Sequence, residues 1–325
     1  MATGIRFADK SITVSPSYAE QLRVASDGLE RVIGDVVGIS NAIGTDFADK
    51  AIQHLRNYKP ADQLYKSLLE KIQENEELSR RLEEQSPELL AGLWSCDKVT
   101  NKKRREILQR TRNKLLLQAE YGLEIDPDKK LAVMVHRVAD QKGYQLLLEA
   151  SEGIIQRLDY QVIAGGPVIN GDQQSEDLGR GLADMAEFYP GKVSVKLGFL
   201  DVRMLLLGSD VFLMPSRHEP GGISQIEALA CGCLVIARAT GGLRDSIRPI
   251  QVRGSQITGN GILFTDYSSG AFYDAMRRFA GFINNADENM RYRARENARN
   301  SAAYWDTPAR QYLDIMYDHK EIIRP

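Results

Sequence analysis

The sequence predicts an α/β fold, in which a mostly parallel sheet is covered by helices on both faces. Short apolar stretches recur through the second half of the chain, and helical patterns separate them. The six predicted strands are Leu131–Val135, Gln161–Ala164, Val193–Val195, Val211–Met214, Leu234–Ile236 and Ile262–Phe264. The helical patterns are Tyr144–Leu158, Glu176–Phe188, Ile226–Ala230 and Phe272–Phe282. This alternation is typical of a parallel sheet buried on both faces.

Two further regions precede this one. Near the start, Ser11–Val14 is a predicted strand, and a helix is expected to follow with Ser15 as its cap and Pro16 at its first position. From about Tyr58 to Glu120 the chain is rich in Leu, Glu, Lys, Arg and Gln, with apolar residues four apart. We expect several helices there, with a break near Ser86-Pro87.

Composition limits the binding partners and the cellular compartment that we expect for this protein. The 325 residues include 42 basic and 44 acidic side chains, so the near-neutral charge of −2 gives no argument for nucleic acid or an anionic membrane as a partner. Three cysteines are too few for a disulfide framework. We find no apolar run of membrane-spanning length and no secretion signal, so we expect a cytoplasmic protein.

The most informative motif runs from Ser216 to Glu227. A predicted strand delivers Glu219 to a turn, Gly221-Gly222, which opens a helix. Free N–H groups and the helix dipole favour a bound phosphate there. Because phosphate repels a carboxylate, Glu219 needs another partner such as sugar hydroxyls. The motif therefore predicts a nucleotide-sugar site at the carboxyl ends of the strands.

Other residues at the same predicted edge fit a diphosphate, although each has an ordinary alternative. Arg137 and Lys142 follow the first strand of the sheet; they are either diphosphate ligands or solvated loop cations. Phe199 either stacks on a base or belongs to the core. The run from Thr240 to Leu243 either donates N–H groups or forms a plain turn. We interpret Gly165-Gly166 as a turn.

Taken together, these motifs resemble the donor domain of the glycogen and starch synthases, which are retaining glucosyltransferases of the two-Rossmann-domain (GT-B) type. The likeness covers most of residues 131–265. It extends to the segments from Phe7 to Ala19, from Gly38 to Asp46 and from Tyr304 to Met316, the last of which resembles the family's final crossover helix. The fold that the resemblance implies is a Rossmann-like domain with a helical insertion.

The resemblance implies a role for each site residue. Arg137 and Lys142 would neutralise the diphosphate, and Glu219 would hold hydroxyls of the transferred glucose. Phe199 would lie against the base. The remaining donor-binding residues that it implies are Gly221, Gly222 and Ile223 through their N–H groups, Thr240 and Gly241 near the distal phosphate, and Glu227 at the ribose.

Some positions depart from the family's usual pattern. His136 stands in place of a small residue, and we interpret it as a packed histidine. Glu227 stands where bacterial synthases usually carry an aromatic residue. Asp126-Pro127-Asp128 matches an Asp-x-Asp metal motif in form only, and its Pro and the lysines after it fit a surface turn. We expect no metal or other cofactor, because fixed cations and dipoles can stabilise the leaving diphosphate.

The expected domain division follows from the same resemblance. Residues 1–27 would be the remnant of an acceptor-side domain with its linker, and residues 28–325 the nucleotide-sugar domain. Its helical insertion would span about 56–120. The family's Lys-x-Gly-Gly-Leu loop and most of its acceptor groove have no match, so we expect the chain to be a fragment or one partner of a split enzyme, inactive by itself.

The expected reaction is transfer of glucose from ADP-glucose or UDP-glucose to the non-reducing end of an α-1,4-glucan. Two alternatives stay open. One is another GT-B transferase, either sucrose-synthase-like or acting on lipid or protein, which the pair Glu219 and Glu227 permits. The other is a nucleotide-sugar-binding module without catalysis. A dinucleotide oxidoreductase is disfavoured, because no Gly-x-Gly-x-x-Gly follows the first strand.

Overall fold

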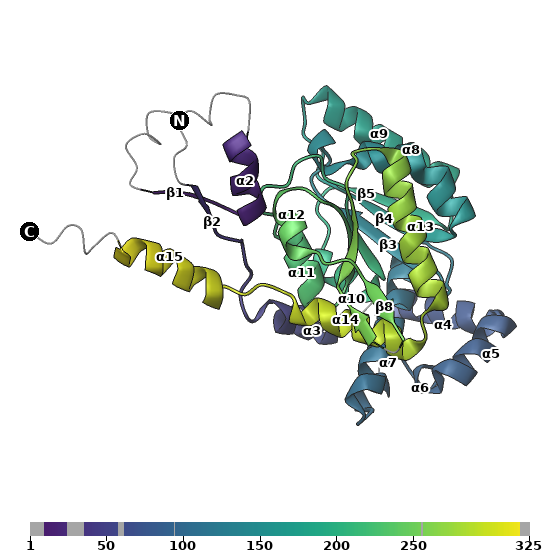
Figure 1. Ribbon diagram of the computed structural model, residues 1–325. Helices are drawn as coiled ribbons and strands as arrows, with labels where there is room; N and C mark the ends of the chain where they lie inside the picture. The colour runs from purple at the N-terminus through teal and green to yellow at the C-terminus, as the bar shows by residue number, and fades with distance from the viewer. Residues whose placement is uncertain (1–9, 25–35, 58–61, 94, 255, 319–325) are drawn as a thin grey trace, which may run out of the picture.

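The computed structural model describes residues 10–24, 36–57, 62–93, 95–254 and 256–318. A six-stranded sheet lies at its centre (Figure 1). The strands are β3 (Lys130–Val135), β4 (Tyr160–Gly166), β5 (Val193–Leu197), β6 (Val211–Met214), β7 (Leu234–Arg238) and β10 (Gly261–Phe264). They lie in the order β10-β7-β6-β3-β4-β5, and all pairs are parallel. The predicted fold class is confirmed, and all six predicted strands are present.

Helices cover both faces of this sheet (Figure 1). On one face lie α8 (Tyr144–Glu152), α9 (Gln173–Phe188) and α13 (Ser269–Asn285). On the other lie α3 (Phe47–Asn57), α7 (Lys102–Glu120), α10 (Val202–Gly208), α11 (Ser224–Ala230), α12 (Gly241–Ser246) and α14 (Glu288–Asn300). Every residue of β4 and β6 is buried as a result, which explains why β6 is apolar at every position instead of alternating.

A helical subassembly precedes the sheet. It consists of α4 (Asp62–Glu74), α5 (Glu76–Gln85), α6 (Pro87–Leu90), the 3₁₀ turn η2 (Ser95–Lys98) and α7. The break predicted near Ser86-Pro87 is present: α5 ends at Gln85, and Pro87 is the first residue of α6. These helices enclose a small core of their own, which includes Leu68, Ile72, Leu82 and Leu108. The expected domain division and the limits of the insertion stay predictions.

The N-terminal segment folds against the sheet domain. Strand β1 (Ser11–Thr13) pairs in parallel with β2 (Val36–Gly38), and α2 (Pro16–Val24) packs beside α12 (Figure 1). The sequence predicts β1, but it does not predict its partner strand β2. Of the predicted remnant 1–27, residues 1–9 and 25–27 lie outside the described residues.

Several elements were not predicted. They are the hairpin β8 (Gln251–Arg253) and β9 (Gln256–Thr258), the helices α3, α10 and α14, and the 3₁₀ turn η3 (Asp140–Lys142). The π turn η4 (Gly153–Arg157) lies inside the helical stretch predicted over Tyr144–Leu158 and continues α8. The predicted last helix is α15 (Asp306–Asp318), and Tyr304 just before it forms a bridge with Ile43. In the described chain, no helix is both long and apolar enough to span a membrane.

Candidate functional site

The candidate site lies where the strand order reverses, between β3 and β6. Chain connections leave the sheet in opposite directions at this point, and ligands of such folds bind outside the carboxyl ends of the strands there. The loops that follow the two strands are bonded to each other. The Arg217 N–H donates to the Gln141 carbonyl (2.8 Å), and the Gln141 amide donates to the His218 carbonyl (3.0 Å). The two loops therefore form one surface.

Lys142 and Glu219 form the centre of this surface. The Lys142 Nζ lies 2.6 Å from Glu219 Oε2, although the residues are 77 positions apart in the chain. The Ser216 hydroxyl donates to the same carboxylate oxygen at 3.1 Å. Only 9% of the Glu219 side chain and 17% of the Lys142 side chain are exposed. A carboxylate this buried needs its charge compensated, and Lys142 supplies that compensation.

The glycine turn lies directly beside Glu219. Gly222 has a positive φ of 58°, a conformation that favours glycine, and α11 begins two residues later. Ile223 precedes the helix as its N-cap and provides no side-chain hydrogen bond to the first turn. The arrangement agrees with the predicted role of Gly221, Gly222 and Ile223, which stays a prediction.

Thr240 and Gly241 lie behind this turn. The Thr240 N–H donates to the Arg238 carbonyl (2.8 Å), and the Gly242 N–H donates to the Glu219 carbonyl (3.0 Å). A Cβ at Gly241 would collide with that same carbonyl. This segment therefore supports the backbone of Glu219, and its predicted contact with the distal phosphate stays a prediction.

Arg137 and Phe199 occupy the open part of the edge. Arg137 is exposed just past the end of β3, and 88% of Phe199 is exposed past the end of β5. Hydrogen bonds from His136 to Gly165 (3.2 Å) and from Gly198 to Gly166 (2.9 Å) hold these strand ends in register. Neither residue belongs to the Lys142–Glu219 pair, but both are accessible to a ligand bound across the edge.

Glu227 is separate from the pair. It lies in the first turn of α11, and burial raises the pKa of its carboxyl above the usual value. Among the described residues, no hydrogen bond or ion pair joins it to Lys142 or Glu219, and its predicted contact with a ribose stays a prediction.

His136 is a packed residue, as interpreted from the sequence. It is 7% exposed, its Nε2 lies 2.9 Å from the Leu213 carbonyl, and its ring tilts against Phe212. Burial lowers the pKa of His136 to about 4, so the ring is neutral near pH 7. It joins β3 to β6 directly beneath the site.

Sequence reasoning missed several residues that shape the site. The motif from Ser216 to Glu227 carries no signal for the role of Ser216, whose hydroxyl donates to Glu219. The Tyr144 hydroxyl accepts from the His136 N–H (3.0 Å) and bonds to the Gly165 carbonyl (2.6 Å). Gly165 and Gly166 are the end of β4 with positive φ angles, not a separate turn as interpreted. An apolar pattern carries no signal for such polar contacts.

The Asp126-Pro127-Asp128 segment is a turn, as expected. Both carboxylates pair with Arg81, at 3.3 and 2.7 Å, and the segment precedes β3 at the opposite edge of the sheet. Among the described residues, no three His, Cys, Asp or Glu side chains are grouped to hold a metal ion. A reaction without metal stays a prediction.

The parallel sheet, with its order reversed between β3 and β6 and helices on both faces, defines a Rossmann-like domain. The family can also be named: a model of the glycosyl transferases group 1 matches residues 120–301, and the chain belongs to this family. The match covers the sheet, α8 to α14 and every site residue named above. The family is that of the predicted enzyme class, the glycosyltransferases.

Individual proteins agree with the expected subfamily. Glycogen synthase 1 of Synechocystis is 30% identical over 327 residues, which cover 97% of this chain and 57% of that protein. The catalytic domain of Arabidopsis thaliana starch synthase IV, bound to ADP and acarbose, superposes with a TM-score of 0.69 at 22% identity over 96% of this chain and 56% of that one. Anabaena HepE in complex with UDP and glucose gives a TM-score of 0.54 at 15% identity, covering 97% and 67%.

These similarities confirm the resemblance to the glycogen and starch synthases and the GT-B type of the fold. The chain spans a little over half the length of the glycogen synthases that it matches.

Proposed function

We propose that this chain binds a nucleoside diphosphate glucose and takes part in transferring its glucose to the non-reducing end of an α-1,4-glucan, with retention at the anomeric carbon. The observation that carries the proposal is the Lys142–Glu219 pair (2.6 Å) at the reversal point of the sheet, beside the glycine turn. The similarity to glycogen synthases supports the choice of glucose and glucan.

In this proposal the pair serves as a switch between two sets of partners. Without a ligand, Lys142 and Glu219 compensate each other. When the donor binds, the Lys142 ammonium turns to the diphosphate, and Glu219 accepts hydrogen bonds from glucose hydroxyls. Both charges then keep a partner of opposite charge or a hydrogen-bond donor, so that neither is left buried alone.

The same cations would assist the reaction. As the bond from the anomeric carbon to the diphosphate breaks, negative charge grows on the leaving group. Arg137 and Lys142, already positioned at the edge, stabilise that charge more than they stabilise the bound donor. Gly221, Gly222 and Ile223 add N–H groups at the start of α11.

For the nucleoside we propose Phe199 as the surface for the base and Glu227 as the partner of the ribose. The starch synthase structure contains ADP and the HepE structure UDP, and we propose one of these two nucleotides for this chain. We further propose that glucan transfer requires an acceptor-side domain, in the same chain or in a second one.

Calorimetric titration with ADP, UDP, ADP-glucose and UDP-glucose in metal-free buffer tests the site. We expect one nucleotide series to bind, and Lys142→Ala to weaken its binding about tenfold or more, because a charge-assisted hydrogen bond is lost. Lys50→Ala, an exposed lysine paired with Asp46, is the matched control. Equal affinities of the wild type and Lys142→Ala would remove Lys142 from the site.

A second candidate is a transferase of the same type with another acceptor, since Glu227 is present on α11 where bacterial synthases usually carry an aromatic residue. Radiolabelled donor offered with maltodextrin, a small sugar or lipid, in the presence of an acceptor-side domain, separates the two. Donor binding without any transfer would instead favour a binding module.

A further inference from the structure

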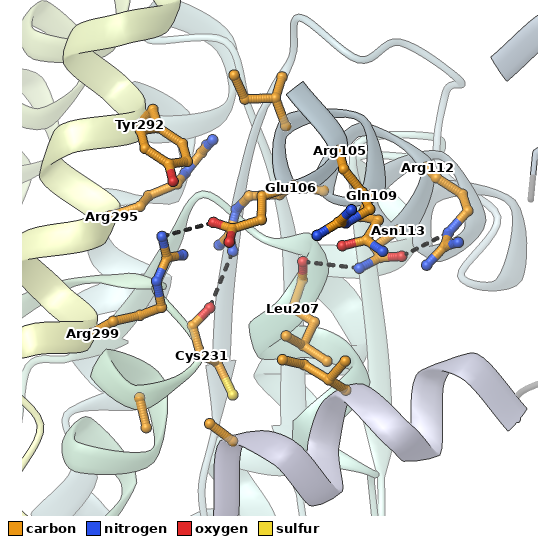
Figure 2. A pocket seen from close by; sticks show the side chains of 15 residues that line it. Arg105, Glu106, Gln109, Arg112, Asn113, Leu207, Cys231, Tyr292, Arg295 and Arg299 are labelled. Atoms are coloured by element: carbon orange, nitrogen blue, oxygen red, sulfur yellow. Dashed lines mark hydrogen bonds and ion pairs between the residues drawn. The ribbon is translucent and has the colours of Figure 1, made fainter. Parts of the chain in front are cut away.

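A second cavity lies at the opposite edge of the sheet (Figure 2). Leu207, Ala230 and Cys231 line it from the segments that precede β6 and β7, and α7 and α14 form its walls. Because the strands are parallel, these amino ends face away from Lys142 and Glu219. The cavity measures about 200 Å³. It is therefore separate from the donor site, and we call it the amino-edge cavity.

The lining of this cavity is strongly basic. Figure 2 shows Arg105 and Gln109 of α7 on one side and Tyr292, Arg295 and Arg299 of α14 on the other. Five arginines line it together with a single carboxylate, which is Glu106. The arginines are Arg105, Arg110, Arg112, Arg295 and Arg299.

Carboxylates compensate three of these arginines. Arg299 pairs with Glu106 at 3.0 Å, and Arg112 pairs with Asp97 at 3.1 Å. Arg295 pairs with Asp210 at 3.1 Å, but Asp210 also holds Lys114 at 2.6 Å. One carboxylate thus serves two cations at this edge.

The other two arginines bond only to backbone carbonyls within the described chain. Arg105 donates to Val99 at 2.9 Å. Arg110, only 9% exposed, donates to the carbonyls of Cys231, Leu206 and Ser209. A carbonyl dipole does not neutralise a full charge, so positive charge remains in excess here.

Two donor groups are also left over. Among the described residues, the buried Nε atoms of Arg110 and Arg295 have no hydrogen-bond partner. Buried donors are nearly always satisfied, so each exception calls for an explanation. Burial, together with the charge of Arg110, lowers the pKa of Arg295 to about 9. Both observations show a concentration of cations and free donors that an anion would compensate.

We propose that the amino-edge cavity binds a small phosphate-bearing anion, either inorganic phosphate or the phosphate ester of a small metabolite. Guanidinium groups match the geometry of phosphate oxygens. The Gln109 amide lines the same cavity; one of its two N–H groups donates to Asp97 at 2.7 Å, which leaves the other as a neutral donor. The volume is below the range of about 300–1,000 Å³ typical of larger organic ligands, which favours a small anion over a nucleotide-sugar.

Calorimetric titration with inorganic phosphate and with glycerol 3-phosphate, at constant ionic strength, tests this proposal. Binding is expected in the wild type and also in Lys142→Ala, whose donor site has lost one of its two proposed cations for the diphosphate. Tighter binding of glycerol 3-phosphate identifies an ester as the ligand class, and tighter or equal binding of phosphate identifies the inorganic ion.

Three variants test whether the anion binds in the amino-edge cavity. The double variant Arg105→Gln/Arg299→Gln removes two partly exposed cations and should weaken binding about tenfold or more. Glu106→Gln removes the one carboxylate that lines the cavity and should tighten binding several-fold. Arg277→Gln, on the exposed face of α13, should change nothing. Thermal unfolding of each variant checks that it is folded.

Glu106→Gln protects the test against misfolding of the double variant, because a gain of affinity does not come from a damaged structure. If neither anion binds to Lys142→Ala, or if Glu106→Gln and the folded double variant bind as the wild type does, the proposal is wrong. The arginines would then serve only to join α7 to α14.

Discussion

At the scale of single residues, the Glu219 carboxylate is both compensated in charge and fixed in orientation without a ligand. Lys142 and Ser216 bond to the same oxygen, Oε2. The second oxygen is thereby left as the acceptor for a ligand hydroxyl, which is the role proposed for it.

Replacing Glu219 by Gln separates the recognition of sugar from that of nucleotide. The amide keeps the size of the side chain but loses the charge, so hydrogen bonds from glucose hydroxyls become weaker. We expect the affinity for the nucleotide-sugar to fall about tenfold, while the affinity for the nucleoside diphosphate changes little or rises. Titrations with both ligands give the comparison. An equal loss for both would contradict the sugar role.

His136 gives the fold a defined response to acid. Its folded-state pKa of about 4 lies below the ordinary value of 6.5, so the folded protein binds fewer protons than the unfolded chain. The contribution of His136 is thus fully present above pH 6.5 and is lost as the pH falls towards 4. Between pH 7 and 5 this amounts to about 2 kcal/mol.

His136→Gln removes that titration and keeps an amide that can donate to the Leu213 carbonyl. Urea unfolding at pH 7 and pH 5 should show a smaller loss of stability in the variant than in the wild type, by about 2 kcal/mol. The variant is expected to be less stable at pH 7, because the ring packs on Phe212. Parallel stability losses of the two proteins would mean that His136 does not titrate in this way.

At the scale of elements, the site depends on how closely the loop after β3 approaches the loop after β6. Gly143 joins η3 to α8 with a φ of 80°, and a Cβ on it would collide with the Pro215 carbonyl. The approach brings Lys142, the preceding residue, within reach of Glu219. The packing of the two elements therefore determines the geometry of the charge pair.

Gly143→Ala should impair both stability and donor binding. The left-handed conformation costs about 1–2 kcal/mol for a non-glycine residue, and displacement of the loop adds to it. Gly122→Ala is the matched control, because Gly122 has a φ of 66° but open space around its Cα. We expect both variants to lose stability and only Gly143→Ala to lose donor affinity as well. Equal donor affinity in the two variants would refute the positioning role.

Prediction from sequence succeeded for elements whose pattern of apolar residues reflects how they are buried. The stretch Val211–Met214 was placed correctly because a strand buried on both faces is apolar at every position. It failed for β2 and for the hairpin of β8 and β9, which are three residues long and mostly exposed or half-buried. Such strands are defined by their partner, which a linear pattern does not reveal.

The two proposed ligand sites differ in the same way. Glu219 and the glycine turn are adjacent in sequence, so local order predicted them together. The arginines of the amino-edge cavity come from α7 and α14, and on α7 they read as solvated charges of a polar helix. Folding encloses α7 between the sheet domain and the small helical core, and Arg110 and Arg112 become buried there. Only the tertiary structure shows that these arginines of α7 and α14 gather around one cavity.

At the scale of the whole molecule, the N-terminal segment is attached to the back of the donor site. The Ser15 hydroxyl donates to the Pro220 carbonyl at 2.5 Å, next to Glu219. Ser17 bonds to Asp245 of α12 through both its N–H (2.9 Å) and its hydroxyl (2.6 Å). A carboxylate from α12 thus caps the first turn of α2. We therefore expect movements of this segment to be coupled to the segment that holds Glu219.

Asp245→Ala should release α2 from α12. The variant loses the two hydrogen bonds from Ser17 and the favourable charge at the start of α2, which predicts a loss of about 1–2 kcal/mol. Hydrogen exchange should become faster in 16–24, 36–39 and the adjoining turn 219–222, and remain unchanged in β4 and α9. Asp274→Ala, which removes an exposed carboxylate paired with Arg277 and Arg278 on α13, is the control. If exchange rises in α2 but the turn 219–222 keeps its protection, the segment is docked on the site without being coupled to it.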